Sequence, residues 1–572
     1  MKTIFKSLLF LMAVTTGMTL SSCSSDNNLP AADALFRPVL TENNNIEHGL
    51  DENLSPYMIV TWDNFTDATQ YVITAVANDG SDSQTITTDT TICQFNNLQY
   101  DKEYNVSIHC ENTTTGLSSK DFTLTTTTLD YPTKLSSVST SDVIDTQVRI
   151  SWSDVSYDVL EIVKDNNDEV IATIELTDED NEAGSIIVRN LDPSTSYRVL
   201  AYANDEYLGK KRFTTTGEEN YGDDVVIDLR SLTEEESAKY ITTDLITADI
   251  EANPDKNITY VLQGGVKYTI SSLAIPAYAK RLKFVTGLTL AGNAEFINSS
   301  AITVAKGVEI EAIEFEKIHF YAGNGEEDVK TNTKKGFSSK QVFNINGTGT
   351  TVKSLSFKSC RVDNYRAVVR GQTVNDHIQN TVFDDCIING IGDQGVITNA
   401  DKGGDFQSMK ATNCTFTNIV MFADLRKTKG AVTMDFENCT FCYAPVETTA
   451  NANTPLFRFG SNTVTLNIKK TLFGPSMFTK DGKGVDAGIT TYKAGENGSI
   501  LLNASKTTVN VENSYKTDFT YTPFGETATI YPIEGLTESK LSETGLWKAP
   551  AEGIFNVIGK LDETGIGDAR WF

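Results

Sequence analysis

The strongest constraint on the fold is a seven-residue motif that recurs four times between residues 341 and 479. The copies read Ser-Phe-Lys-Ser-Cys-Arg-Val, Val-Phe-Asp-Asp-Cys-Ile-Ile, Lys-Ala-Thr-Asn-Cys-Thr-Phe and Asp-Phe-Glu-Asn-Cys-Thr-Phe. Their cysteines are spaced 26, 28 and 25 residues apart, at Cys360, Cys386, Cys414 and Cys439. A second apolar block separates the copies, so each period holds at least two strands. Such a unit can bury its apolar face only by stacking on its neighbours.

Periods of this length fit a leucine-rich repeat or a parallel β-helix. The strands are rich in β-branched and aromatic residues and lack the L-x-x-L-x-L spacing, which favours the β-helix. Stacked coils should place the four cysteines in one buried column at about 4.8 Å per rung. A metal site or disulfides would be the alternative, but C-x₂-C pairs are missing and adjacent rungs hold Cβ atoms too far apart. The polar residue before each cysteine predicts a bend whose backbone it caps, at Ser359, Asp385, Asn413 and Asn438.

The first residues read as a secretory signal peptide over 1–22, with Lys2 and Lys6 before a short apolar run. Leu-Ser-Ser-Cys at its end resembles a bacterial lipobox, which implies that Cys23 is diacylated; a cleaved signal with an incidental cysteine is the alternative. Residues 23–30 resemble the tether that directs lipoproteins to the surface of some Gram-negative glycan-foraging bacteria. We therefore expect a cell-surface lipoprotein of the outer membrane, anchored by this lipid alone, because no later stretch is long and apolar enough to span a bilayer.

Residues 31–129 and 130–217 predict two β-sandwiches of alternating short strands. Trp62 and Trp152 lie early in the two modules, and Tyr104 and Tyr197 lie late. This pattern resembles fibronectin type III modules, in which the Trp fills the core and the Tyr hydroxyl ties a corner to backbone. They are read as spacers rather than ligand-binding modules, since no aromatic cluster stands out on the predicted loops. Cys93 and Cys110 either pair or remain two buried thiols.

Residues 218–572 form the predicted solenoid. Thr233 and Glu236 fit a capping box, which predicts a short helix to about Tyr240. A helix followed by a strand and Gly-x-x-Tyr resembles the opening of pectate-lyase-like right-handed β-helices, where the helix plugs the core. The ending Gly-Asp-Ala-Arg-Trp resembles the Gly-Asp-Pro-Arg-Trp tail of uncharacterised surface-lipoprotein domains, with Ala569 in place of proline. The predicted fold is all-β: two Ig-like sandwiches, then a right-handed parallel β-helix with an N-terminal capping helix.

The charge is strongly negative and uneven along the chain. The net charge is −28, which argues against nucleic acid as a partner. Residues 30–216 hold 31 acidic against 11 basic side chains, a net of −20, whereas residues 217–572 hold 44 against 35, a net of −9. The solenoid is therefore the less repulsive host for an acidic polymer.

The resemblance to pectate-lyase-like folds implies action on acidic polysaccharides, by a base that is usually Arg or Lys and a cation beside the uronate carboxylate. Arg366 or Arg370 is the candidate base. The candidate substrate-binding residues are Lys353, Arg361, Tyr365, Arg370 and Arg458. Asp363 and Asp393 could hold Ca²⁺ through oxygen ligands. The sequence shows neither the acid column of a uronate lyase nor the close carboxylate pair of a hydrolase.

Repeat alignment places Arg370 and Arg458 in one column, three coils or about 14 Å apart, where they could hold successive carboxylates. The other predicted members of the column are Asn344, Thr398, Ala423 and Thr479. His319 and His377 are read as structural. The insertion 322–340 is either a lid for a glycan groove or a solvated loop. Tyr321, Tyr365 and Tyr443 are predicted to be exposed and able to stack on sugar rings.

The leading functional hypothesis is a surface lipoprotein that binds an acidic, pectin-like polysaccharide along its β-helix and passes it to outer-membrane glycan-uptake proteins. A polysaccharide lyase using Arg366 or Arg370 is the first alternative. A non-catalytic adhesin, with the solenoid as a stalk, is the second.

Overall fold

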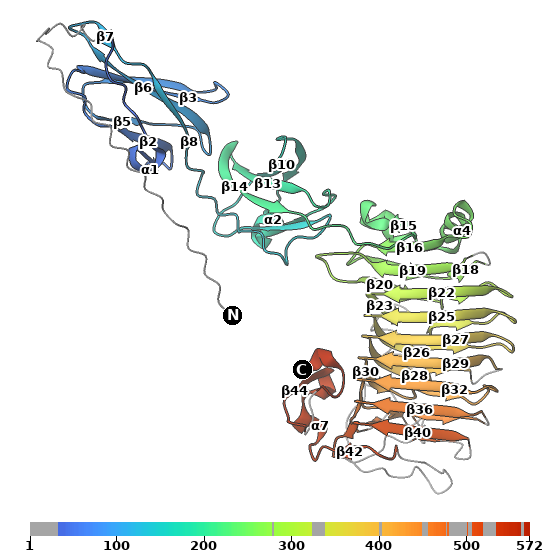
Figure 1. Ribbon diagram of the computed structural model, residues 1–572. Helices are drawn as coiled ribbons and strands as arrows, with labels where there is room; N and C mark the ends of the chain where they lie inside the picture. The colour runs from blue at the N-terminus through green and yellow to red at the C-terminus, as the bar shows by residue number, and fades with distance from the viewer. Residues whose placement is uncertain are drawn as a thin grey trace, which may run out of the picture.

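The computed structural model describes residues 33–276, 279–322, 338–399, 403–448, 456–460, 462–475, 477–479, 500–501, 506–518, 533–561 and 565–572. Two β-sandwiches lead into one end of a long stack of parallel coils (Figure 1). The signal peptide, Cys23 and its tether lie outside the described residues, as does most of the predicted insertion. Among the described helices, none is long and apolar enough to cross a membrane.

The first module is a sandwich of two antiparallel sheets with the strand arrangement of a fibronectin type III module. One sheet holds β1 (Ile46–Leu50), β2 (Pro56–Thr61) and β5 (Ile92–Phe95), with the short α1 (Glu42–Asn45) preceding β1. The other holds β3 (Gln70–Ala77), β4 (Ser83–Thr88), β6 (Glu103–Asn112), β7 (Leu117–Ser118) and β8 (Phe122–Thr127). Trp62 lies in the core and the Tyr104 hydroxyl accepts from the Gln99 amide at 3.2 Å, as predicted. Cys93 and Cys110 are buried free thiols.

The second module repeats this plan. β9 (Val148–Ser151) pairs with β12 (Ser185–Val188), and the second sheet holds β10 (Val159–Lys164), β11 (Val170–Glu175), β13 (Ser196–Ala203) and β14 (Glu206–Thr214). Trp152 is buried and the Tyr197 hydroxyl accepts from the Asp192 amide at 2.8 Å. The short α2 (Asp178–Ala183) was not predicted, although a capping box between Thr177 and Asp180 starts it.

The junctions between the three parts are held by polar contacts. Lys210 of the second sandwich forms an ion pair with Asp101 of the first. Arg230 of the solenoid forms one with Asp145 of the second sandwich at 2.9 Å, and the Asp145 side chain is fully buried. The Arg149 guanidinium donates to the Leu290 carbonyl at 2.9 Å. Both linkers are therefore fastened to their neighbours.

The solenoid is a parallel β-helix, as predicted. Its first sheet runs in the order β15 (Val225–Asp228), β16 (Asn257–Leu262), β19 (Arg281–Thr286), β22 (Glu309–Glu316), β25 (Thr351–Lys358), β27 (His377–Asp384), β29 (Asp405–Thr412), β32 (Val432–Glu437), β36 (Val464–Lys469) and β40 (Thr507–Glu512). Its second sheet runs β17 (Lys267–Ile270), β20 (Ala294–Asn298), β23 (Ile318–Ala322), β26 (Arg361–Gly371), β28 (Ile387–Thr398), β30 (Thr415–Ile419), β33 (Thr440–Cys442), β37 (Leu472–Phe473), β41 (Tyr515–Lys516) and β42 (Thr537–Glu538).

A third face completes the coils. β26 and β28 are long enough to turn a corner, and their later residues pair with β24 (Gln341–Ile345) and β31 (Ala423–Leu425). β31 continues to β35 (Phe457–Phe459) and β39 (Ile500–Leu501), while β18 (Ala274–Ile275) pairs with β21 (Thr303–Val304) and β34 (Val446–Thr448) with β38 (Met477–Thr479). Between the faces, stacked aromatic rings fill the core, as in the ladder of Phe284, Phe315, Phe357 and Phe383.

The predicted cysteine column is confirmed. The amide after each cysteine donates to the carbonyl of the cysteine one rung before, as Ile387 does to Cys360 at 3.0 Å and Thr415 to Cys386 at 2.9 Å. All four thiols are buried and free. The column continues beyond Cys439 with hydroxyl groups, because the Cys439 amide donates to the Thr471 hydroxyl and the Thr471 amide to the Ser514 hydroxyl. Every member of this column is therefore a small side chain at a tight corner of its coil.

The residues before the cysteines form the predicted bend, by a mechanism that the sequence did not reveal. Ser359, Asp385, Asn413 and Asn438 all adopt left-handed backbone, with φ of 49°, 55°, 53° and 53°. Asn and Asp tolerate this conformation best among residues with a side chain. The side chains of Ser359 and Asn413 donate to the Asp385 carboxylate, at 2.9 and 3.0 Å. They bond along the stack, which makes a polar column beside the cysteines.

The chain makes helices at the first end of the core and folds back on itself after the far end. At the first end, η1 (Leu229–Ser231) precedes α3 (Glu234–Ala238), which begins with the predicted capping box. An unpredicted second helix, α4 (Thr243–Ala252), buries Ile246 and Ile250 in the solenoid core. At the far end the chain folds back beside the second sheet as α7 (Glu543–Leu546), β43 (Trp547–Ala549), η2 (Pro550–Glu552), β44 (Ile554–Val557) and η3 (Ala569–Trp571) (Figure 1).

We call residues 541–561 and 565–572 the clasp. Trp547, Phe555 and Ile566 of the clasp are fully buried in a cluster with Leu472 and Tyr515 of the solenoid. This cluster is separate from the main core of the coils. The clasp is thus a small domain-like unit that packs on the outside of the second sheet.

Candidate functional site

The structure distributes the predicted basic cluster over three faces. Lys353 points from the first sheet, where it forms ion pairs with Glu309 and Glu311 at 2.7 Å each. Arg361 belongs to the second sheet, and Arg366 and Arg370 to the third face. These side chains therefore do not line one common groove.

The predicted exposure of Tyr365 and Tyr443 is wrong. Tyr365 is fully buried, and its hydroxyl donates to the Asn298 side chain at 2.8 Å. Asn364, which precedes Tyr365, has left-handed backbone with a φ of 69° and ends the regular alternation of the strand, so the next side chain turns inward. Tyr443 is 2% exposed. Tyr321 is half-buried and does reach a cavity.

Arg366, the candidate base, is paired with Asp393, a candidate calcium ligand. The Arg366 Nε donates to Asp393 Oδ1 at 2.7 Å and its Nη2 to Oδ2 at 3.1 Å. A carboxylate neighbour favours the protonated guanidinium, which is the wrong form for a base. Burial and the charge of Arg366 lower the pKa of Arg370 from its ordinary value. The roles proposed for both residues stay predictions.

The third-face column is confirmed in part. Arg370 pairs with Asn344 and Thr398, and Arg458 lies two rungs beyond Thr398, as the repeat alignment predicted. The member between them is Asp424, not Ala423, because Ala423 pairs with the inward-facing Ile397. Asp424 forms ion pairs with Arg426 at 2.8 Å and with Arg458 at 3.6 Å. An acid therefore lies between the two cations of the predicted column.

The two candidate calcium ligands do not share a site. Asp363 lies on the second sheet with Arg361, and Asp393 lies beside Arg366. Within the part of the chain that the structure describes, no three His, Cys, Asp or Glu side chains gather where they could hold a metal ion. Each carboxylate instead has an arginine as its partner.

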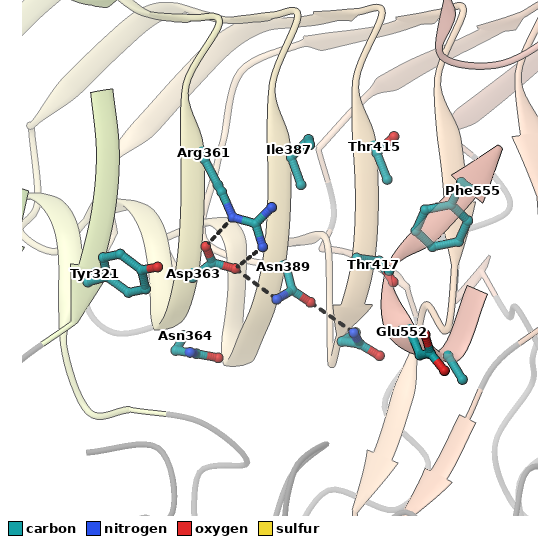
Figure 2. Close-up of a pocket in the computed structure, with 13 residues that line it drawn as sticks. Tyr321, Arg361, Asp363, Asn364, Ile387, Asn389, Thr415, Thr417, Glu552 and Phe555 are labelled. Carbon is teal, nitrogen blue, oxygen red and sulfur yellow. Dashed lines mark hydrogen bonds and ion pairs between the residues drawn. The ribbon is translucent and has the colours of Figure 1, made fainter. Parts of the chain in front are cut away.

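A cavity of about 400 Å³ lies between the second sheet and the clasp (Figure 2). Parallel register builds the sheet wall, because Tyr321, Asp363, Asn389 and Thr417 occupy one row across β23, β26, β28 and β30. Arg361, Ile387 and Thr415 form the row beside it. The opposite wall comes from η2 and β44 of the clasp, with Glu552 and Phe555. The site thus joins residues more than two hundred positions apart in sequence, from Tyr321 to Phe555.

Asp363 organises the sheet wall. The Arg361 Nε donates to Asp363 Oδ2 at 2.6 Å, His319 Nε2 lies 2.7 Å from the same oxygen, and Asn389 donates to Oδ1 at 2.8 Å. Burial works to raise the pKa of Asp363, but the His319 hydrogen bond and the Arg361 charge outweigh it and hold that pKa below its ordinary value. Asp363 is therefore a buried, ionised anchor whose partners hold it in place.

Arg361 presents positive charge to the cavity. Burial works against its charged form, yet Asp363 outweighs this and raises the pKa of Arg361. Its side chain remains 47% exposed, and only Nε and Nη2 bond to Asp363. A guanidinium carries five N–H donors, so further donors remain for a ligand.

Two buried polar atoms at the cavity have no partner among the described residues. They are the Thr417 hydroxyl and the side-chain oxygen of Asn418, whose amide nitrogen donates to Asn389 at 2.8 Å. Thr417 is 2% exposed and Asn418 is 7% exposed, and both line the cavity. Buried polar groups in native proteins almost always have a partner. Unsatisfied atoms at a polar cavity therefore indicate a ligand or ordered water.

Sequence reasoning missed most of this wall. Thr417, Asn418 and the clasp residues were not singled out, whereas His319, predicted to be structural, contacts Asp363 and does not line the cavity. One signal was present: Asp363, Asn389 and Thr417 each lie three positions after a column cysteine, so repeat alignment places them in one row. The approach of Glu552 and Phe555 had no such signal, because it depends on the docking of the clasp.

No protein-family model matches the sequence, and a comparison with curated proteins found no match. Among solved structures, the chain is similar to a two fibronectin type III domain segment from chicken tenascin, at 16% identity, covering 32% of this chain and 99% of that one with a TM-score of 0.17. It is also similar to the FN1–FN3 domains of chicken CNTN1, at 14% identity, covering 32% and 68% with a TM-score of 0.15. Both TM-scores are low, and the sandwich assignment rests on the strand pairing described above.

Proposed function

We propose that the cavity between the second sheet and the clasp binds an acidic, pectin-like glycan. The observation that carries the proposal is the pair of unsatisfied atoms on Thr417 and Asn418 beside the half-exposed Arg361. A sugar hydroxyl both donates and accepts, so it could satisfy both atoms. A uronate carboxylate matches the remaining donors of Arg361 in charge and geometry.

The shape of the cavity supports the same class of ligand. Its volume of about 400 Å³ lies in the range of small-molecule sites. Tyr321 at one side and Phe555 at the other supply apolar ring surface, while the amides and hydroxyls between them supply hydrogen bonds. This combination suits sugar rings, which have apolar faces and polar edges.

We further propose that the two sandwiches display the solenoid outside a Gram-negative bacterium, with lipid on Cys23 as the anchor in the outer membrane. The lipobox-like sequence and the acidic, polar tether support this anchor. Two sandwiches in series, with ion pairs at both junctions, would hold the cavity at a distance from the bilayer. Glycan-uptake proteins in the same membrane would be the partners.

Binding can be tested by calorimetry with trigalacturonate and by retardation in gels containing polygalacturonate. We expect Arg361→Gln to weaken binding about tenfold or more, since a charge-assisted hydrogen bond is lost. Arg370→Gln, on the third face, is the matched control and should bind as the native protein does. Native affinity in Arg361→Gln, or loss of binding in Arg370→Gln alone, would contradict the assignment of the site.

Incubation of the protein with polygalacturonate tests the lyase alternative. Lyase products absorb at the unsaturated uronate band, so growth of that absorbance would make the protein an enzyme. The ion pair of Arg366 with Asp393 gives no specific support to that alternative. Gel retardation without growth of absorbance would favour binding of the glycan without cleavage. Failure to bind trigalacturonate or polygalacturonate would favour the hypothesis of a non-catalytic adhesin.

A further inference from the structure

The last residues of the chain fasten the cavity wall to the solenoid. The indole of Trp571 packs edge-on against the ring of Phe555, with 5.7 Å between the ring centroids. Phe555 and the nearby Glu552 line the cavity. We call Gly567 to Trp571 the latch. Arg570 and Asp568 of the latch do not line the cavity, but they are connected to it through Trp571 and Phe555.

The latch runs along the coils one rung at a time. The Gly567 amide donates to the Lys470 carbonyl at 2.8 Å, the Asp568 amide to the Thr440 hydroxyl at 3.0 Å and the Ala569 amide to the Asn413 side chain at 2.6 Å. The Arg570 Nη2 then donates to Asp385 Oδ1 at 2.8 Å. Lys470, Asn413 and Asp385 all belong to the column of left-handed bend residues. The regular spacing of that column therefore serves as the docking track of the latch.

The fit of the latch is close. Asp568 is fully buried, where it accepts from the Thr415 hydroxyl at 2.6 Å and from Arg570 Nε at 2.9 Å. Gly567 has a φ of 96°, and a Cβ there would lie 2.7 Å from Leu472 and 3.0 Å from Thr440. Trp571 Nε1 also donates to Thr415, which lines the cavity, at 2.7 Å. These demands account for Gly, Asp, Arg and Trp in the terminal motif.

We propose that Asp568, Arg570 and Trp571 are positioning residues that hold Glu552 and Phe555 against the cavity. The ligand affinity of the site is then set partly by a contact, Arg570 with Asp385, that no ligand touches. This part of the inference rests on the proposed function. The mechanical part, that the latch immobilises the wall, holds whether or not a glycan binds.

The test uses the full chain with Arg570→Ala and, as a second variant, Asp385→Asn, which keeps the native tail. Hydrogen exchange without ligand is measured over residues 551–557. We expect roughly tenfold faster exchange there in both variants, with exchange in the coils unchanged. Lys353→Ala removes two ion pairs on the first sheet and is the matched control. Unchanged exchange at 551–557 in both variants would overturn the inference.

Affinity for trigalacturonate then tests the link to the site. We expect Arg570→Ala to weaken binding about fivefold to tenfold, and Arg570→Lys to recover part of it. Phe555→Ala should weaken binding in the native background and have little further effect in Arg570→Ala, because contacts that act as one unit are not additive. Additive effects would contradict positioning through the latch. Absence of binding by the native chain would instead contradict the proposed function. The hydrogen-exchange measurement would then still test whether the latch immobilises the cavity wall.

Discussion

The first and second sheets of the solenoid are built from the same coils, but the charged groups around Lys353 and around Asp363 differ in their exposure to solvent. On the first sheet, Lys353 and its partners Glu309 and Glu311 are 34%, 61% and 55% exposed, so water solvates these three charges. On the second sheet, Asp363 is 3% exposed and is held by Arg361, His319 and Asn389. Among the described residues, the clasp packs on the second sheet and not on the first. Burial of polar groups under a cover, rather than their number, therefore marks the candidate site.

The largest expected difference between the two sheets is in stability. Asp363→Ala should lower the free energy of unfolding by about 3 kcal/mol, since it removes the buried carboxylate that Arg361, His319 and Asn389 hydrogen-bond. Thermal and urea unfolding measure the change. A loss of stability similar to that caused by removing an exposed ion pair would mean that Asp363 contributes no more to folding than the exposed charges of the first sheet.

The same carboxylate should make stability depend on acid pH. The pKa of Asp363 is lower in the folded protein than the ordinary value of 3.8, so its contribution is fully present above that value and is lost as pH falls through the folded pKa. Comparison of the native chain with Asp363→Asn between neutral pH and about pH 3 should show the gap narrowing in acid. A gap that widens as pH falls would contradict this assignment of charge.

A smaller effect is expected at Thr417, where a substitution should change ligand affinity without lowering stability. Thr417→Val removes a buried hydroxyl that has no partner among the described residues, so stability should stay the same or rise by about 1 kcal/mol. Affinity for trigalacturonate should nevertheless fall about fivefold, because a ligand hydroxyl loses its partner. Calorimetry and thermal unfolding of one sample give both values, and a parallel loss of stability and affinity would count against a ligand contact at Thr417.

The smallest effect is expected on the first sheet. Lys353→Ala should change the free energy of unfolding only slightly, as is usual for exposed ion pairs, and should leave glycan affinity unchanged. High salt should remove most of the difference. A clear loss of polygalacturonate retardation would restore Lys353 to the binding site and remove the contrast between the sheets.

The repeated features of the fold could be predicted from the sequence, because several copies of one motif agree. Four spaced cysteines predicted the coils and the column, and Thr233 with Glu236 predicted α3. A feature that depends on a single residue could not be predicted, as at Asn364, whose left-handed backbone turns Tyr365 inward. Contacts made by docking could not be predicted either, because Phe555 meets Trp571 and the second sheet only after the clasp folds back. Half of the candidate site was therefore present in the repeat, and the other half depends on tertiary structure.

The most direct test of the account is a crystal structure of the protein with trigalacturonate. We predict a sugar between the second sheet and the clasp, with its carboxylate on Arg361 and a hydroxyl bonded to Thr417 or Asn418. A sugar bound instead along Arg370 and Arg458 on the third face, or a cavity occupied by water alone at saturating ligand, would contradict it.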